Sequence, residues 1–114
     1  MQLIPVYRVT VFVPPAGLEA LKQGILAVDD LAAGGYAQGM WESAPGQEQF
    51  RVLQGTQSAI GQAGELVRVA AVRLEFCIPR DTQRLQRILD EGIAANHPWN
   101  SPAVFVDTTE FAAP

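Results

Sequence analysis

Residues that carry chemistry are scarce in this chain, which has one histidine, His97, and one cysteine, Cys77. A single cysteine excludes an intrachain disulfide, which fits a reducing compartment. A single histidine is too few for a metal centre built from several histidines of one chain. No Ser-His-Asp, Cys-His or paired-carboxylate arrangement has a spacing that indicates catalysis. These absences favour a binding protein over an enzyme.

Charge is also scarce, at 18% of residues, and the formal net charge is -4. The eight Lys and Arg residues are scattered along the chain, which argues against a nucleic-acid partner. Arg80, Arg84 and Arg87 come close together, but acidic residues lie among them. We interpret this group as a solvated helix face of mixed charge and not as a phosphate site.

Long hydrophobic runs are missing, since no segment approaches the roughly 20 apolar residues that a membrane span needs. Residues 1–8 lack the basic start, apolar stretch and small-residue cleavage site of a signal peptide. We therefore expect a cytoplasmic protein with no membrane partner. The length of 114 residues and the 48% hydrophobic content predict one globular domain over residues 1–114.

The first half of the chain predicts a strand, a helix and a hairpin. Residues 7–13 are rich in β-branched and aromatic side chains and precede two prolines, as a strand would. Apolar residues at steps of three and four predict a helix over residues 16–31, which the glycine pair 34–35 would end. The runs 36–43 and 49–54, with Ala-Pro-Gly between them, predict an additional β-hairpin.

The second half has the clearest strand, in which alternate residues from 72 to 78 are apolar. Asp81 or Thr82 would cap a helix that ends near residue 95. Residues 103–107 form the last expected strand. The order strand-helix-strand thus occurs twice.

This order predicts an α+β protein with a ferredoxin-like βαββαβ sandwich, in which two helices cover one face of an antiparallel sheet. A sheet of this size leaves unpaired edges that a partner subunit can cover. A homo-oligomer is therefore expected.

Several short sequence segments occur in a recognisable order and spacing. They are residues 7–14 (Tyr-Arg-Val-Thr-Val-Phe-Val-Pro), 34–36 (Gly-Gly-Tyr), 50–55 (Phe-Arg-Val-Leu-Gln-Gly), 60–61, 64–65 and 97–103 (His-Pro-Trp-Asn-Ser-Pro-Ala). Together they resemble the small domain inserted in proteins of the Nif-three-like family, whose fold is akin to that of the PII and CutA proteins. The resemblance covers nearly the whole chain and implies a stand-alone PII/CutA-like domain that associates as a trimer.

The chain departs from that family at residues that matter for chemistry. Asn100 and Ser101 stand where the family's closing segment has two glutamates, and Ala37 stands where an acidic residue is usual. Full-length members bind a pair of metal ions through two further lobes, which have no counterpart among these residues. Their hydrolase labels are therefore not transferred.

Four residues are the candidate ligand-binding set: Tyr36, Trp41, His97 and Trp99. The aromatic side chains could stack on a flat ligand, although filling the core or an interface is the favoured interpretation. His97 lies where Pro98 ends a helix, and its imidazole could bind a metal ion or carry a proton. The favoured alternative is a helix C-terminal residue that interacts with unpaired carbonyl groups.

Cys77 and the loop 61–64 are two further features that we interpret as structural and not as functional. Cys77 lies on the strand face opposite the core residues, and we interpret it as a packing residue because no base or cation is evident to activate the thiol. Residues 61–64 could present backbone N–H groups to an anion. Turn chemistry is the better explanation, since this loop leads into a strand and lacks the Lys-Ser/Thr ending of a P-loop.

The sequence thus predicts a non-enzymatic, oligomeric binding or regulatory module of the PII/CutA-like type. It would bind a small ligand, a metal ion or a protein partner at clefts between subunits, with no certain cofactor and a divalent metal ion as one candidate. The alternative is a small metal-dependent enzyme that uses His97 with carboxylates such as Asp107 or Glu110 of the same or a neighbouring subunit. A purely structural assembly domain is a third hypothesis.

Overall fold

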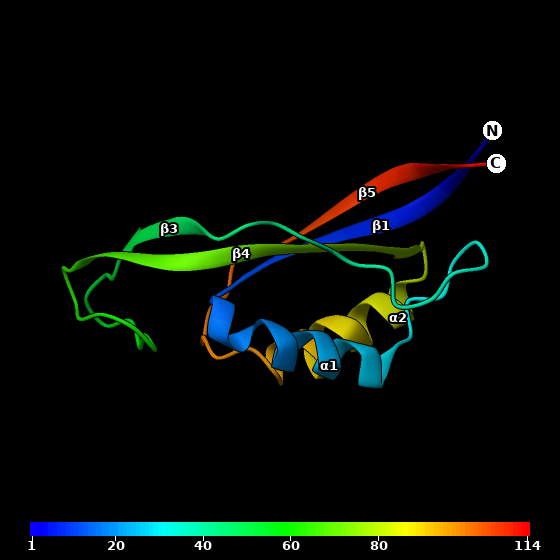
Figure 1. Ribbon diagram of the computed structural model, residues 1–114. Helices are drawn as coiled ribbons and strands as arrows, with labels where there is room; N and C mark the ends of the chain where they lie inside the picture. The colour runs from blue at the N-terminus through cyan, green and yellow to red at the C-terminus, as the bar shows by residue number, and fades with distance from the viewer.

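Five antiparallel strands form one sheet, and the helical segments lie together against one of its faces (Figure 1). The computed structural model describes residues 1–114. The elements in chain order are β1 (Gln2–Val13), η1 (Pro15–Gly17), α1 (Leu18–Val28), β2 (Trp41–Glu42), β3 (Gly46–Arg51), β4 (Leu66–Pro79), α2 (Thr82–Arg87), η2 (Ile88–Ala94) and β5 (Val104–Ala113). η1 is a 3-10 turn, and η2 is a π-helix that continues α2. None of the helical segments has the length and apolar character needed to cross a bilayer.

β1 is a central strand of the sheet. It pairs with β4 over residues 6–13 and with β5 over residues 2–11. β2 and β3 lie on the other edge of β4, so the order is β2-β4-β1-β5 with β3 beside β2. This arrangement confirms the predicted ferredoxin-like sandwich with helices on one face.

The core lies between the sheet and the helices. Side chains at alternate positions of β1 and β4 point toward α1 and η2, as the alternation of residues 72–78 predicted. The fully buried side chains are Val9, Val11, Val13, Leu21, Ile25, Leu74, Ile78, Ile88 and Ile93. Each buried side chain of this size stabilises the fold by about 1.5–3 kcal/mol relative to an exposed one.

The long strands extend beyond the predicted segments because their ends pair with one another. Residues 2–5 of β1 pair only with residues 110–113 of β5, and these ends project beyond β4 as a two-stranded ribbon (Figure 1). Residues 66–69 of β4 pair with residues 48–51 of β3. Such distant pairings have no signature in the local sequence.

The runs 36–43 and 49–54 do not pair with each other, as the expected hairpin would require. Instead, both pair with the same side of β4, where Glu42 is opposite Leu74 and Gly46 is opposite Ala71. Gly46 lies four residues after Glu42, whereas their partners on β4, Ala71 and Leu74, are only three residues apart. Residues 43–45 therefore contain one extra residue, as in a β-bulge. Pro45 lies within this irregular stretch, where its lack of a backbone N–H removes no ladder hydrogen bond.

α1 ends at Val28, three residues before the predicted end. Asp29 has extended backbone geometry, and its carboxylate accepts a hydrogen bond from the Leu31 N–H at 2.8 Å, an alternative to continued helix. The same carboxylate binds the Arg84 guanidinium through two contacts of 2.9 Å, which ties the end of α1 to α2. The glycines at 34 and 35, with φ of 57° and 86°, turn the chain farther on.

α2 begins where the sequence predicted, because the Asp81 carboxylate accepts the N–H groups of Gln83 and Arg84 at 3.0 and 3.1 Å. Its continuation η2 packs closely on α1. A Cβ at Gly92 would lie 3.2 Å from the Cα of Ile25, so this approach of the two backbones depends on glycine.

A second glycine, Gly24 on α1, lies against the side chain of Asn96. The Asn96 amide donates to the carbonyl oxygens of Glu91 and Gly92, at 3.1 and 2.8 Å, and so satisfies acceptors near the end of η2. A Cβ at position 24 would overlap the Asn96 side chain. Absence of a side chain is therefore required at this contact.

We expect Gly24→Ala to lower the free energy of unfolding by about 1–3 kcal/mol, because overpacking outweighs the gain in helix propensity. Urea denaturation at neutral pH measures the change. Gly39→Ala is the control: a Cβ there meets nothing within 4 Å, and its effect should stay within about 0.5 kcal/mol. A Gly24→Ala protein as stable as the parent would contradict the packing described.

Candidate functional site

The segment 97–103 connects η2 to β5 and is held to β1 by His97. The His97 Nε2 lies 2.7 Å from the carbonyl oxygen of Phe12, and the Trp99 N–H donates to His97 Nδ1 at 3.0 Å. A carbonyl oxygen can only accept, so Nε2 carries the proton and Nδ1 is the acceptor. Both ring nitrogens of the neutral imidazole are therefore used within the chain.

Burial lowers the pKa of His97, and this effect outweighs the opposite effect of the Phe12 hydrogen bond. A metal ion would need a ring nitrogen with a free lone pair, and Nδ1 is occupied. The carboxylates proposed as companions lie along β5, where Asp107 is opposite Arg8 and Glu110 is opposite Pro5. Within residues 1–114, no cluster of three His, Cys, Asp or Glu side chains could hold a metal ion.

Of the four predicted ligand-binding residues, the structure brings only His97 and Trp99 together. Their ring centroids are 5.4 Å apart. Trp41 lies on β2, where the Arg73 guanidinium stacks 4.8 Å from its ring centroid. Tyr36 is 81% exposed in the turn beyond the C-terminal end of α1, whereas His97 lies near the N-terminal end of that helix.

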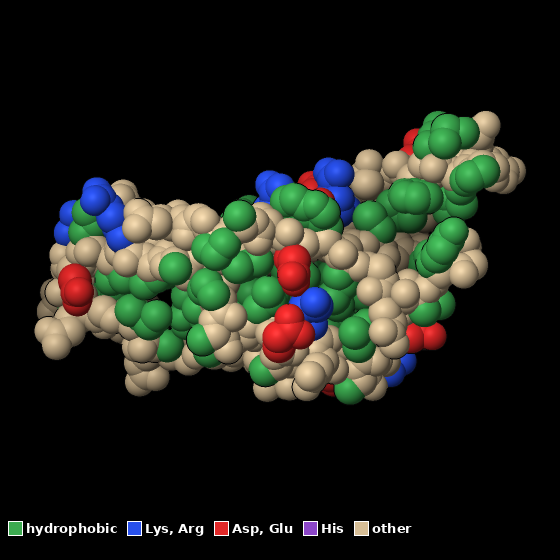
Figure 2. All heavy atoms as spheres, viewed as in Figure 1, with side chains coloured by type: hydrophobic (Ala, Val, Ile, Leu, Met, Phe, Trp, Pro, Cys, Tyr) green, Lys and Arg blue, Asp and Glu red, His purple; other side chains and the backbone are tan.

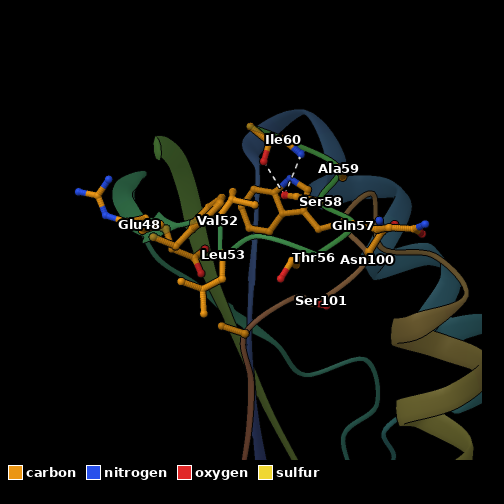
Figure 3. Close-up of a pocket in the computed structure, with 14 residues that line it drawn as sticks. Glu48, Val52, Leu53, Thr56, Gln57, Ser58, Ala59, Ile60, Asn100 and Ser101 are labelled. Carbon is orange, nitrogen blue, oxygen red and sulfur yellow. Dashed lines mark hydrogen bonds between the residues drawn. The ribbon is translucent and has the colours of Figure 1, made fainter. Parts of the chain in front are cut away.

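Trp99 borders a cavity of about 350 Å³ between the end of β3, the loop 52–60 and the segment 99–103 (Figure 3). The cavity has apolar side chains on one part of its lining: Phe50, Val52, Leu53, Ala59, Ile60, Trp99 and Ala103. The polar and charged residues of the lining are Glu48, Arg51, Thr56, Gln57, Ser58, Asn100 and Ser101. Apolar walls with a few polar groups are the usual composition of a small-molecule site.

Glu48 on β3 is the acidic residue of this cavity. It also borders a second hollow, lined among others by Phe12, Arg73 and Phe105, on the sheet face that the helices leave uncovered. The Glu48 Oε2 atom is buried and has no hydrogen-bond partner. Burial raises the pKa of this carboxyl. A buried oxygen without a partner is rare in folded proteins and marks a place where a donor is missing.

Each of the two hollows also has one basic residue in its lining, and both of these residues have another partner. Arg51 donates from Nη1 to the carbonyl oxygen of Gly64 at 2.6 Å, and Arg73 lies on the ring of Trp41. Strand alternation also places the side chain of Arg51 on the opposite face of β3 from Glu48 and Phe50. Glu48 forms no ion pair with either arginine.

Glu48 was not among the residues predicted from the sequence. The available signal was its position two residues before Phe50, which places both side chains on the same face of a strand. A loop covers that face of the strand, and local sequence does not show against which part of the protein a loop packs. The loop residues Gly61 and Gly64 have φ of 85° and 82°, in agreement with the interpretation of turn chemistry.

Cys77 lies on the uncovered sheet face, as the alternation of β4 predicted, with Arg8 as its neighbour on β1. The residue is half-buried, and burial raises the pKa of its thiol above the ordinary value. A raised pKa reduces the fraction of reactive thiolate. This favours the packing interpretation.

The state of His97 has a consequence for stability at acid pH. Because burial depresses its pKa in the folded protein, the unfolded chain takes up a proton near pH 6.5 before the folded one does. Stability is therefore fully present above pH 6.5 and falls as the pH drops through the folded-state pKa. We expect the free energy of unfolding to fall between pH 7.5 and 5, and His97→Leu to remove this part of the fall.

At pH 7.5, His97→Leu should be less stable by about 1–3 kcal/mol, because the Phe12 carbonyl and the Trp99 N–H lose their partner. Urea denaturation at several pH values measures both effects. Since the chain has no other histidine, an equal slope in the two proteins between pH 7.5 and 5 would contradict the assignment.

No family model and no curated protein sequence matches the chain. Solved structures do match. A Bacillus cereus protein related to NIF3 superposes with a TM-score of 0.75 at 23% identity, over 95% of this chain and 26% of that one. CutA1 from Oryza sativa superposes with a TM-score of 0.68 at 17% identity, over 97% and 85% of the two chains.

A B. subtilis GlnK-ATP complex superposes with a TM-score of 0.54 at 12% identity, over 91% of this chain and 82% of that one. The chain spans about a quarter of the length of the NIF3-related protein but corresponds to most of CutA1 and GlnK. These likenesses agree with the resemblance found in the sequence. The chain has the ferredoxin-like fold shared by CutA1, GlnK and a region of the NIF3-related protein.

Proposed function

We propose that this chain is a non-enzymatic binding or regulatory module of the PII/CutA-like type, which forms a homo-oligomer, with a trimer favoured, and binds a small molecule or a protein partner. The observation that carries the proposal is the sheet face left uncovered by the helices. Phe12 and Phe105 meet there edge to face with ring centroids 6.4 Å apart, and Phe105 is 58% exposed. Exposed aromatic groups of this kind are typical of interfaces.

The edge strand β5 supports assembly through a second feature. Its ten residues pair with β1 on one side only. The ribbon that it forms with β1 carries the exposed side chains of Leu3 and Phe111, and Figure 2 shows hydrophobic side chains gathered on this projection. A long strand edge without a partner invites another strand, and a second copy of the chain would cover it.

The structural neighbours support the type of module. GlnK, one of these neighbours, is known in complex with ATP, so a protein of this fold can hold a small molecule. CutA1 corresponds to nearly the whole of this chain and has 85% of its own length covered. For this chain, we propose that its ligand sites lie at clefts bordered by neighbouring subunits.

A metal-dependent enzyme is the weaker proposal. It would require His97 to give up the hydrogen bond to its Nδ1 atom or to lose its proton from Nε2. It would also require carboxylates from a neighbouring subunit, because Asp107 forms an ion pair with Arg8 at 3.6 Å. Elemental analysis of protein purified without an affinity tag tests this alternative directly.

We expect light scattering across micromolar concentrations to report an oligomer, and Phe105→Asp to shift it toward the monomer by placing a charge on the proposed interface. Tyr36→Asp is the matched control, since it makes the same kind of change at an exposed aromatic residue near the other end of α1. Circular dichroism verifies that both variants fold. A parent protein that is monomeric throughout, or a Phe105→Asp variant that assembles like the parent, would count against the proposed assembly.

A further inference from the structure

Residues 98–102 form a short irregular loop, and the backbone of one residue, Phe12, holds both of its ends. The His97 Nε2–H donates to the Phe12 carbonyl oxygen at 2.7 Å, and the Phe12 N–H donates to the Ala103 carbonyl oxygen at 3.1 Å. Between these two anchors the loop makes one hydrogen bond, from the Trp99 N–H to His97 Nδ1 at 3.0 Å. The conformation of the loop therefore depends on the state of a single ring nitrogen.

Nδ1 accepts this hydrogen bond only while the imidazole is neutral. Protonation adds a hydrogen to Nδ1, so that two donors, the Nδ1–H and the Trp99 N–H, face each other. The Trp99 N–H then needs another acceptor, and water supplies one only if the loop moves. The bond from Nε2 to the Phe12 carbonyl survives, because both ring nitrogens of a charged imidazole are donors. Protonation thus breaks the internal hydrogen bond of the loop and keeps its anchors.

No charged side chain next to the ring offsets this effect of protonation. The chain on either side of it, residues 9–17 and 92–103, contains no Asp, Glu, Lys or Arg. The next acidic residues along α1 and η2, Glu19 and Glu91, form ion pairs with basic neighbours. Burial is the larger influence on the pKa of His97 and lowers it, whereas the carbonyl partner of the ring raises it. The neutral ring is therefore the stable form while the loop is fixed.

The loop has room to move on the side of the cavity. Trp99, Asn100 and Ser101 line this space of about 350 Å³, so fewer packed atoms oppose a displacement of the loop there (Figure 3). Glu48 and Arg51 line the cavity as well, and neither is among the groups that act on the pKa of His97. A displacement of the loop changes the wall of the cavity.

We propose that His97 is a pH-sensitive switch: protonation of Nδ1 breaks its hydrogen bond with the Trp99 backbone, releases residues 98–102 and opens the cavity wall that Trp99 forms, while the sheet and the helices stay folded. The inference goes beyond the proposed function, because the switch lies within one chain and operates whether or not the chain assembles. It couples the pH of the surroundings to the shape of the cavity.

The direction of the effect follows from proton linkage. In the released loop the ring is exposed to water and has an ordinary pKa of about 6.5, whereas burial depresses the pKa in the fixed loop. Protonation therefore favours release as the pH falls below 6.5, by up to about tenfold in the equilibrium for each pH unit. Above pH 6.5 the ring is neutral in both states, and the loop stays fixed.

Nuclear magnetic resonance of the unmodified protein tests the switch without any substitution. Because the chain has one histidine, its ring nitrogens give a single set of signals that report tautomer and charge. At pH 7.5 we expect a neutral ring with its proton on Nε2. Between pH 7.5 and 5, ring protonation should coincide with an about tenfold or larger loss of hydrogen-exchange protection at the Trp99 amide. The paired amides of β1 and β4 should keep their protection.

Fluorescence measures the exposure of the Trp99 indole in a Trp41→Phe background, where Trp99 is the only tryptophan. We expect the acrylamide quenching constant to rise about twofold or more between pH 7.5 and 5, because the partly buried indole becomes exposed. His97→Gln in the same background is the matched variant. Its amide can donate to the Phe12 carbonyl but cannot gain a charge, so the quenching constant should not change with pH.

Glu48→Gln is the control for the cavity, since burial raises the pKa of this carboxyl and it too gains a proton as the pH falls. This variant should respond to pH like the parent. A Trp99 response that persists in His97→Gln, a protonated ring beside an unchanged Trp99 amide, or a ring that stays neutral down to pH 5 would overturn the proposal. Loss of the far-UV circular dichroism signal in step with the Trp99 response would also overturn it, because release would then be part of global unfolding.

Discussion

The antiparallel pairing of β1 with β4 is the constraint on which the rest of the structure depends. It aligns two rows of apolar side chains on one face, and burial of that face positions α1 and η2. With the helices committed to one side, the opposite face has no covering element. The uncovered aromatic residues, the open edge of β5 and the hollow beside Glu48 all follow from this asymmetry.

Local sequence predicted those features that depend on periodicity or on capping. The apolar alternation of residues 72–78 identified β4, and Asp81 marked the start of α2, because a pleated strand and a helix N-terminus impose such patterns within a few residues. The edge along β4 was not predictable in the same way. Whether residues 41–51 fold back on themselves or continue along a neighbour depends on β4, a strand that begins only at Leu66.

The candidate site was likewise predictable only where it depends on local sequence. His97 drew notice because it is the only histidine, yet its two ring nitrogens brace the turn between η2 and β5. Glu48 is one of several acidic residues and has no motif around it. Its distinction is a lack of partners, which arises only when β3, the loop 52–60 and the segment 99–103 come together. The rarity of histidine therefore said less about a binding site than the unpaired hydrogen-bond acceptor of Glu48, which only the structure shows.

The pairing of Gln2 with Ala113 places the first and last strand residues side by side. A unit whose two ends meet can be accommodated in a surface loop of a larger host polypeptide with little disturbance to either, since the host's chain leaves and re-enters at nearly the same point.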